Sequence, residues 1–167
     1  MRTMDKRLKT PTDLDSKATG PVIEALNRSL ANSFALYMKY KNFHWHLTGR
    51  HFRDLHLMFD EHANQIFATT DILAERARRI GGTSLRSIGH ISELQTIDDN
   101  NAEFVEPANM LTELVSDNQT LVKNLRKAHD VADEANDVAT ASELEPMIDQ
   151  AENRVWFLFE LSQETKG

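Results

Sequence analysis

The sequence contains no cysteine, and only six of its 167 residues are glycine and four are proline. The absence of cysteine excludes a disulfide scaffold, a zinc–thiolate site, an iron–sulfur cluster and a thiol nucleophile. An all-β fold needs a turn about every 8–12 residues, so this shortage of turn residues favours a few long helices instead.

Long apolar runs are also missing. No stretch approaches the roughly 18–20 apolar residues that a membrane-spanning helix needs. The first 20 residues lack the hydrophobic segment of a secretory signal. We therefore expect a cytoplasmic protein without a membrane partner, and the chain length suits one domain with its own core.

The net charge of −7 is unevenly distributed. Residues 1–20 hold five basic and three acidic side chains, a balance of +2, and the rest of the chain carries −9. We expect residues 1–20 to form a flexible, weakly basic tail and residues 21–167 to form one domain. Basic tails can bind DNA, but an acidic domain opposes this and the C-terminal residues 163–167 add no basic extension. Weak, salt-sensitive DNA binding or none is expected, and a merely solubilising tail is the alternative.

Apolar residues recur every three or four positions in four long segments, which predicts four helices. The first covers residues 22–47 behind Gly20-Pro21, and the second covers residues 52–80. The third covers residues 107–134, and the fourth starts at a capping box of Thr140 and Glu143 and reaches about residue 163. Pro146 is expected to shift its start or to kink it. A short helix is expected at residues 90–94 in the long connection, so the predicted fold is an all-α, ferritin-like four-helix bundle.

Candidate metal ligands line one flank of the second predicted helix. His56 and Asp60 are one turn apart, as are Asp71 and Glu75. The 11 positions from Asp60 to Asp71 correspond to roughly 16 Å of helix, too far for one metal site. All four residues can serve one site only if two copies of this helix pack antiparallel about a two-fold axis. The spacing thus predicts a homodimer with two sites, each built from both chains.

His44, at the end of the first helix, continues that helix's buried face and can meet the end of the second helix that carries His56 and Asp60. Two imidazoles and three carboxylates suit iron, manganese or zinc, and bridging carboxylates favour a pair of iron ions. The sequence has no Glu-x-x-His motif, which di-iron centres inside a bundle normally use. The predicted site therefore lies outside the bundle interior.

The most specific pattern is the run Phe43-His44-Trp45-His46-Leu47-x-Gly49-x-x-Phe52-x-x-Leu55-His56-x-x-Phe59-Asp60-Glu61, followed by Asp71-x-x-Ala74-Glu75-Arg76. It resembles the Dps family (DNA protection during starvation), the miniferritins, and the resemblance extends over residues 22–158. It implies ferroxidase ligands His44, His56 and Asp60 from one subunit and Asp71 and Glu75 from its two-fold neighbour. It also implies a hollow 12-subunit shell with tetrahedral symmetry. Hydrogen peroxide would be the preferred oxidant of Fe(II), and ferric oxyhydroxide would be stored inside, protecting the cell and its DNA.

The resemblance extends to two further features. Trp45 would donate an electron near the site, or it would simply pack at an interface. Residues 130–142 resemble the pore segment of the family: Asp137 matches an acidic pore position, and Asp133 and Glu134 are further candidates. Ser142 stands where many relatives have aspartate, and a solvated acidic loop is the alternative to a pore.

Two functions therefore compete for this chain. The first is a ferroxidase that consumes peroxide and stores iron. The second is a non-catalytic shell protein that binds and compacts DNA and keeps a vestigial metal site.

Overall fold

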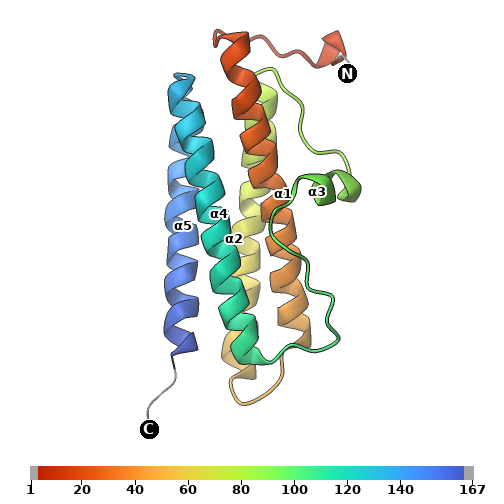
Figure 1. The fold of residues 1–167 in the computed structure, drawn as a ribbon, viewed down its shortest axis with the longest axis vertical. Helices are drawn as coiled ribbons and strands as arrows, with labels where there is room; N and C mark the ends of the chain where they lie inside the picture. Colours follow the sequence, from red (N-terminus) through yellow and green to blue (C-terminus); the bar gives the residue numbers. More distant parts are fainter. Residues whose placement is uncertain (1–3, 164–167) are drawn as a thin grey trace.

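A computed structural model describes residues 4–163, and over that range the chain is helical without any strand. A short 3-10 helix, η1, covers Lys6–Leu8. The other elements are α1 (Ser16–His46), α2 (Phe52–Arg79), α3 (Ile88–Leu94), α4 (Pro107–Glu134) and α5 (Val138–Ser162). The four long helices lie side by side in one bundle (Figure 1), which confirms the predicted fold class.

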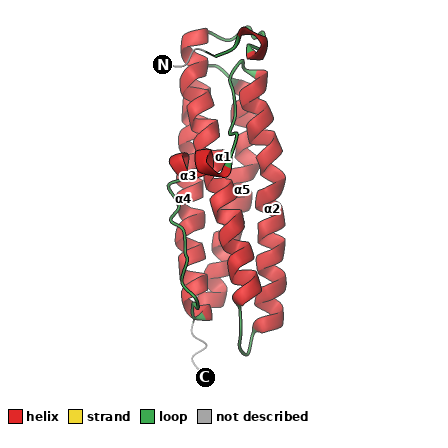
Figure 2. Ribbon diagram, turned by 90° about the vertical axis from the view of Figure 1, so that its right-hand side faces the viewer, coloured by secondary structure: helices red, strands yellow, loops and turns green. Residues whose placement is uncertain are grey.

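Two helical hairpins build the bundle. Helix α1 packs mainly on α2, and α4 packs mainly on α5. The connection from α2 to α4 runs along the bundle and carries α3, which packs against α1 (Figure 2). One long crossover of this kind is typical of ferritin-like bundles. Of the helices described, none is long and apolar enough to cross a membrane.

The core lies between the four long helices, and each helix contributes buried apolar side chains to it. Its largest fully buried apolar members are Leu26, Leu30, Leu36, Tyr40, Phe43, Phe59, Ile66, Leu73, Met110, Leu114 and Leu125. Most of them are three, four, seven or eleven positions apart along a helix, which is close to a whole number of turns. They therefore share one buried face of each helix, and the opposite flank faces outward.

The first helix begins at Ser16, six residues before the predicted start at residue 22. The carboxylate of Asp15 accepts a hydrogen bond from the backbone N–H of Lys17 (2.8 Å), which satisfies one of the free donors at a helix start. Pro21 lies inside this helix without ending it, although its missing N–H removes one backbone hydrogen bond. The last residues of the predicted tail, from Ser16 to Gly20, are therefore part of α1.

Part of the predicted flexible tail is packed against the bundle. The guanidinium of Arg78 donates a hydrogen bond to the carbonyl of Leu8 (2.6 Å), which ties η1 to the end of α2. Arg2 of the predicted basic tail and Lys166 near the C-terminus lie outside the described residues.

The last helix begins at Val138 and not at the expected capping box of Thr140 and Glu143. Asp137 is its N-cap, because its carboxylate accepts a hydrogen bond from the backbone N–H of Thr140 (3.1 Å). Pro146 lies within α5 without ending it.

Candidate metal centre

A tight connection brings the end of α1 back onto the start of α2. The backbone N–H of Phe52 bonds to the carbonyl of Gly49 (3.1 Å), and Gly49 has φ +103°, a left-handed conformation that favours glycine. This turn places His44 of α1 against His56 of α2, with ring centroids 3.7 Å apart and planes tilted by 15°.

The two histidines hold each other through reciprocal hydrogen bonds. Nδ1 of His44 lies 2.7 Å from the carbonyl oxygen of His56, and Nδ1 of His56 lies 2.9 Å from that of His44. A carbonyl oxygen can only accept, so each Nδ1 carries a proton and donates it. In the neutral form of each ring the lone pair is then on Nε2, which is the arrangement that metal-binding histidines use.

Asp60 lies one turn after His56 and is half exposed. Its Oδ1 accepts a hydrogen bond from Nζ of Lys41 (2.6 Å). This bond, together with the positive charge of the Lys41 ammonium, lowers the pKa of the Asp60 carboxyl. Asp60 is therefore ionised at neutral pH and can act as an anionic ligand.

Asp71 and Glu75 lie further along the same helix and are exposed. Glu75 forms an ion pair with Arg79 one turn later (2.8 Å). Because α2 is continuous, Asp71 is displaced from Asp60 by roughly 16 Å along the axis. Within residues 4–163 no three His, Asp or Glu side chains converge on a common metal position. A single chain therefore brings His44 and His56 together, with Asp60 nearby, but leaves Asp71 and Glu75 apart from them.

Large apolar side chains are exposed around these ligands. Trp45 at the end of α1 is 56% exposed, and Leu57 and Phe67 on α2 are 52% and 51% exposed. Exposed apolar surface on this scale is typical of a protein–protein interface. The flank of α2 that carries the candidate ligands thus resembles a surface that another subunit covers.

Comparison with known proteins identifies the family. The model of the ferritin-like domain matches residues 23–167. A DNA protection during starvation protein from Brevibacillus brevis is 38% identical over 133 residues, which cover 80% of this chain and 89% of the relative. This chain belongs to the Dps family. A second protein of that name, from Agrobacterium fabrum, is 32% identical over 92% of this chain and 94% of its own length. The solved structure of DpsC from Streptomyces coelicolor superposes with a TM-score of 0.92 and 26% identity, covering 99% of both chains.

The expected pore residues of this Dps chain lie where α4 meets α5, and they differ in exposure. Asp133 and Glu134 are exposed. Asp137 is only 2% exposed, and its carboxylate forms an ion pair with Arg76 (2.7 Å) while capping α5. Ser142 is exposed in the first turns of α5. Within one chain the Asp137 carboxylate is thus paired with Arg76, while Asp133 and Glu134 are the exposed acidic residues, and the pore assignment stays a prediction.

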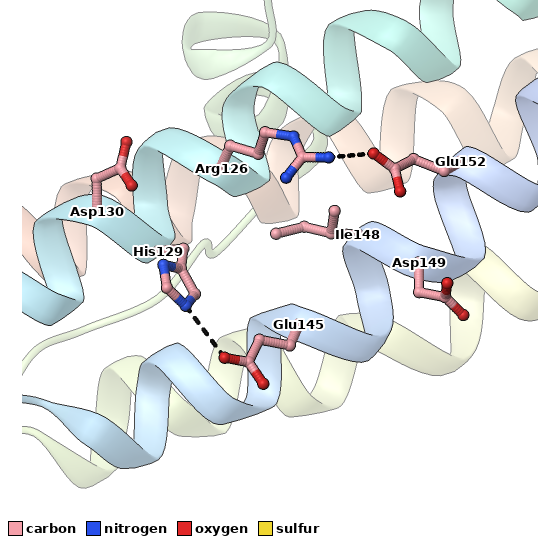
Figure 3. A pocket seen from close by; sticks show the side chains of 7 residues that line it. All are labelled: Arg126, His129, Asp130, Glu145, Ile148, Asp149 and Glu152. Atoms are coloured by element: carbon pink, nitrogen blue, oxygen red, sulfur yellow. Dashed lines mark hydrogen bonds and ion pairs between the residues drawn. The ribbon is translucent and has the colours of Figure 1, made fainter.

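A surface pocket of about 380 Å³ lies between α4 and α5, away from the candidate ligands (Figure 3). Its charged side chains pair with one another: Arg126 donates to Glu152, and His129 lies 3.3 Å from Glu145. The carboxylates of Asp130 and Asp149 point away from these pairs (Figure 3). This geometry does not assemble a metal site.

The bundle interior of this Dps chain holds a polar network that sequence reasoning missed. Each long helix contributes one buried member: Tyr40, His62, Asn118 and Arg154. Asn118 donates to the hydroxyl of Tyr40 (2.8 Å) and accepts from Nε of Arg154 (2.8 Å). A permanently charged guanidinium at this place opposes cation binding inside the bundle. Polar residues interrupting each apolar stripe were the available signal.

Lys41 is a further residue that sequence reasoning missed. It lies three positions before His44 and therefore on the same side of α1. Its position one turn before His44, rather than its residue type, could have indicated that it lies near the candidate ligands.

Proposed function

We propose that this Dps chain is a ferroxidase and iron-storage protein that oxidises Fe(II), preferably with hydrogen peroxide, at di-iron sites between subunits. The observation that carries the proposal is the pair of histidines with protonated Nδ1 and free Nε2 atoms beside the ionised Asp60. Two neutral imidazoles and a carboxylate suit Fe(II), with manganese or zinc as alternatives.

The site is completed by a second copy of the chain. A two-fold axis near the middle of α2 would bring Asp71 and Glu75 of one subunit to His44, His56 and Asp60 of the other. The exposed Leu57 and Phe67 would then be buried in the contact, which supplies a hydrophobic reason for it to form. Six such dimers would form the hollow 12-subunit shell with tetrahedral symmetry that we propose for the cytoplasm.

The chemistry follows from holding two Fe(II) ions as substrates at one site. Two Fe(II) ions supply the two electrons that reduce one peroxide to the oxidation level of water, so no hydroxyl radical needs to form. Overall, two Fe(II), one hydrogen peroxide and two waters yield two FeOOH and four protons. The carboxylates stabilise the Fe(III) product before it moves to the cavity, and consumption of iron and peroxide protects DNA.

Trp45 is proposed to donate an electron near the site when an odd oxidising equivalent is left there. Its exposed ring next to His44 supports this role, and packing at the interface is the alternative. A Trp45→Phe variant separates the two, because only loss of an electron donor would raise hydroxyl radical release while the assembly stays intact.

Mixing two inactive variants tests whether the site is shared. His56→Ala removes a ligand from one half of each site, and Asp71→Ala removes a ligand from the other half. In a mixed dimer one site carries both defects and the other has all five ligands. Random mixing makes half of the dimers mixed, so about a quarter of all sites regain activity. Each variant alone should oxidise Fe(II) with peroxide at a background rate.

The control for this experiment mixes His56→Ala with Asp60→Ala, two changes in the same half-site. That mixture cannot regenerate a complete site, so its rate should stay at background. Recovery in the control, or no recovery in the first mixture after the subunits have exchanged, would contradict a site shared between chains. Unchanged Fe(II) oxidation in the single variants would favour the alternative, a DNA-compacting shell with a vestigial site.

A further inference from the structure

Lys41 occupies an unusual place between the candidate metal ligand Asp60 and the ring of Trp45. Its Nζ lies 2.6 Å from Oδ1 of Asp60 and 5.7 Å from the centre of the Trp45 ring. The Lys41 side chain is only 17% exposed. Lys41 and Trp45 are four residues apart on α1, so the ammonium can contact the ring without any change in the backbone.

We propose that Lys41 is a positioning residue. Its ammonium pairs with Asp60 in the metal-free protein and must be displaced when Fe(II) binds there. This inference rests on the proposed function, because it assumes that Asp60 is a ligand. The bond from Lys41 holds Oδ1 of Asp60, one of the two carboxylate oxygens that a metal would use. A metal that binds through Oδ1 needs a distance of about 2 Å, which leaves no room for an ammonium on the same side of that oxygen.

The displaced ammonium has a favourable alternative position. A cation over the face of a tryptophan is stabilised by the ring, and Lys41 already lies within the usual range of about 6 Å. Moving from Asp60 toward Trp45 therefore keeps part of its stabilisation. A metal ion therefore has to compete with the Lys41 ammonium for Asp60, because the carboxylate is already paired with a cation before the metal binds.

This competition favours metals that bind imidazole well. Fe(II) and Co(II) gain His44 and His56 as ligands when they displace Lys41. Mg²⁺ prefers oxygen ligands and retains its waters, so it gains little from the imidazoles. Lys41 should therefore lower the affinity of the site for every cation that displaces it, and the imidazoles keep Fe(II) and Co(II) ahead of Mg²⁺.

Co(II) titration of the assembled, metal-free protein tests the proposal, since cobalt absorbs visible light when histidine binds it and needs no oxidation step. Lys41→Gln should bind Co(II) about fivefold more tightly, equivalent to about 1 kcal/mol. Lys41→Arg, which keeps the charge, should stay within about twofold of the wild type. Lys127→Gln removes an equal charge from an exposed position on α4 and should leave the affinity unchanged.

Two further variants separate failure of this inference from failure of the proposed function. If His56→Ala and Asp60→Asn abolish cobalt absorption while Lys41→Gln matches Lys127→Gln, the role of Lys41 is wrong and the site stands. If His56→Ala and Asp60→Asn bind Co(II) like the wild type, the proposed site itself is wrong. Lys41→Met, which keeps the apolar stem, checks folding: weaker binding by both Lys41→Met and Lys41→Gln in intact assemblies would also overturn the inference.

Discussion

Acidification should destabilise this protein through His62, a histidine enclosed in the bundle core. The side chain is 3% exposed, and its Nδ1 lies 3.2 Å from the Tyr40 hydroxyl. The hydroxyl accepts from Asn118, so it donates its own proton to Nδ1. Burial, reinforced by the positive charge of Arg154, lowers the pKa of His62 from 6.5 to about 4.

The size of the effect follows from this pKa difference. A histidine with a lowered pKa in the folded state is protonated first in the unfolded state, so stability rises with pH across the window between the two values. The contribution of His62 is complete above about pH 6.5 and is lost as the pH falls to about 4. A difference of about 2.5 units corresponds to roughly 3 kcal/mol of unfolding free energy.

Urea unfolding of wild type and His62→Gln, followed by circular dichroism, measures the effect. Glutamine keeps an acceptor for the Tyr40 hydroxyl but does not titrate. The difference between the two unfolding free energies at each pH removes the contributions of the carboxylates and the surface histidines, which both proteins share. The wild-type advantage should shrink by about 1.4 kcal/mol per pH unit near pH 5. Protein concentration must be constant because subunit association adds to stability. Parallel curves from pH 7 to pH 4.5 would refute the reasoning.

Two further predictions concern the α4–α5 corner and DNA. Asp137→Ala should lower the unfolding free energy by about 2–4 kcal/mol, since it removes a helix cap and leaves Arg76 without its carboxylate. The double variant Asp133→Ser with Glu134→Gln should change the unfolding free energy by less than about 0.5 kcal/mol. It should nevertheless slow iron uptake if these two residues line the pore. Urea unfolding and iron-uptake rates measure these effects, and slow uptake in folded Asp137→Ala with normal uptake in the double variant would reverse the assignment. DNA binding through the tail should be weak and lost at physiological salt, because Arg7 is already paired with Asp5 (2.7 Å) and the domain is acidic. Gel-shift assays with and without residues 1–14 check this, and strong binding that survives the deletion would contradict it.

Much of the fold could be predicted because the signals are local. The start of α4 at Pro107 and its end at Glu134 agree with the periodic pattern and with the preference of proline for a first helical turn. The predicted start of α1 was wrong because Gly20-Pro21 resembled a helix boundary. The residue that caps the helix is Asp15, and the segment after it has little apolar periodicity. The predicted start of α5 was wrong for a related reason, because Asp137 and Thr140 both suit a cap. In the structure the backbone N–H of Thr140 bonds to the carboxylate of Asp137, so Thr140 lies inside the helix.

The candidate site divides in the same way. Residue type and helical spacing identified the five candidate ligands, which are His44, His56, Asp60, Asp71 and Glu75. The same spacing showed that the two groups on α2 cannot reach one metal site within a single chain. These properties depend on positions along one or two helices. The assignment of the five residues as ligands stays a prediction.

Helical periodicity and rise per residue are local properties, so the amino-acid sequence was sufficient to predict the all-helical bundle and the separation of the candidate ligands into two groups. Three features emerged only from the folded chain: the hydrogen bonds that place a proton on Nδ1 of His44 and His56, the ion pair of Lys41 with Asp60, and the burial of Asp137. Each of these depends on side chains that meet across different helices, and no pattern along one segment specifies which distant group will supply the donor or the charge.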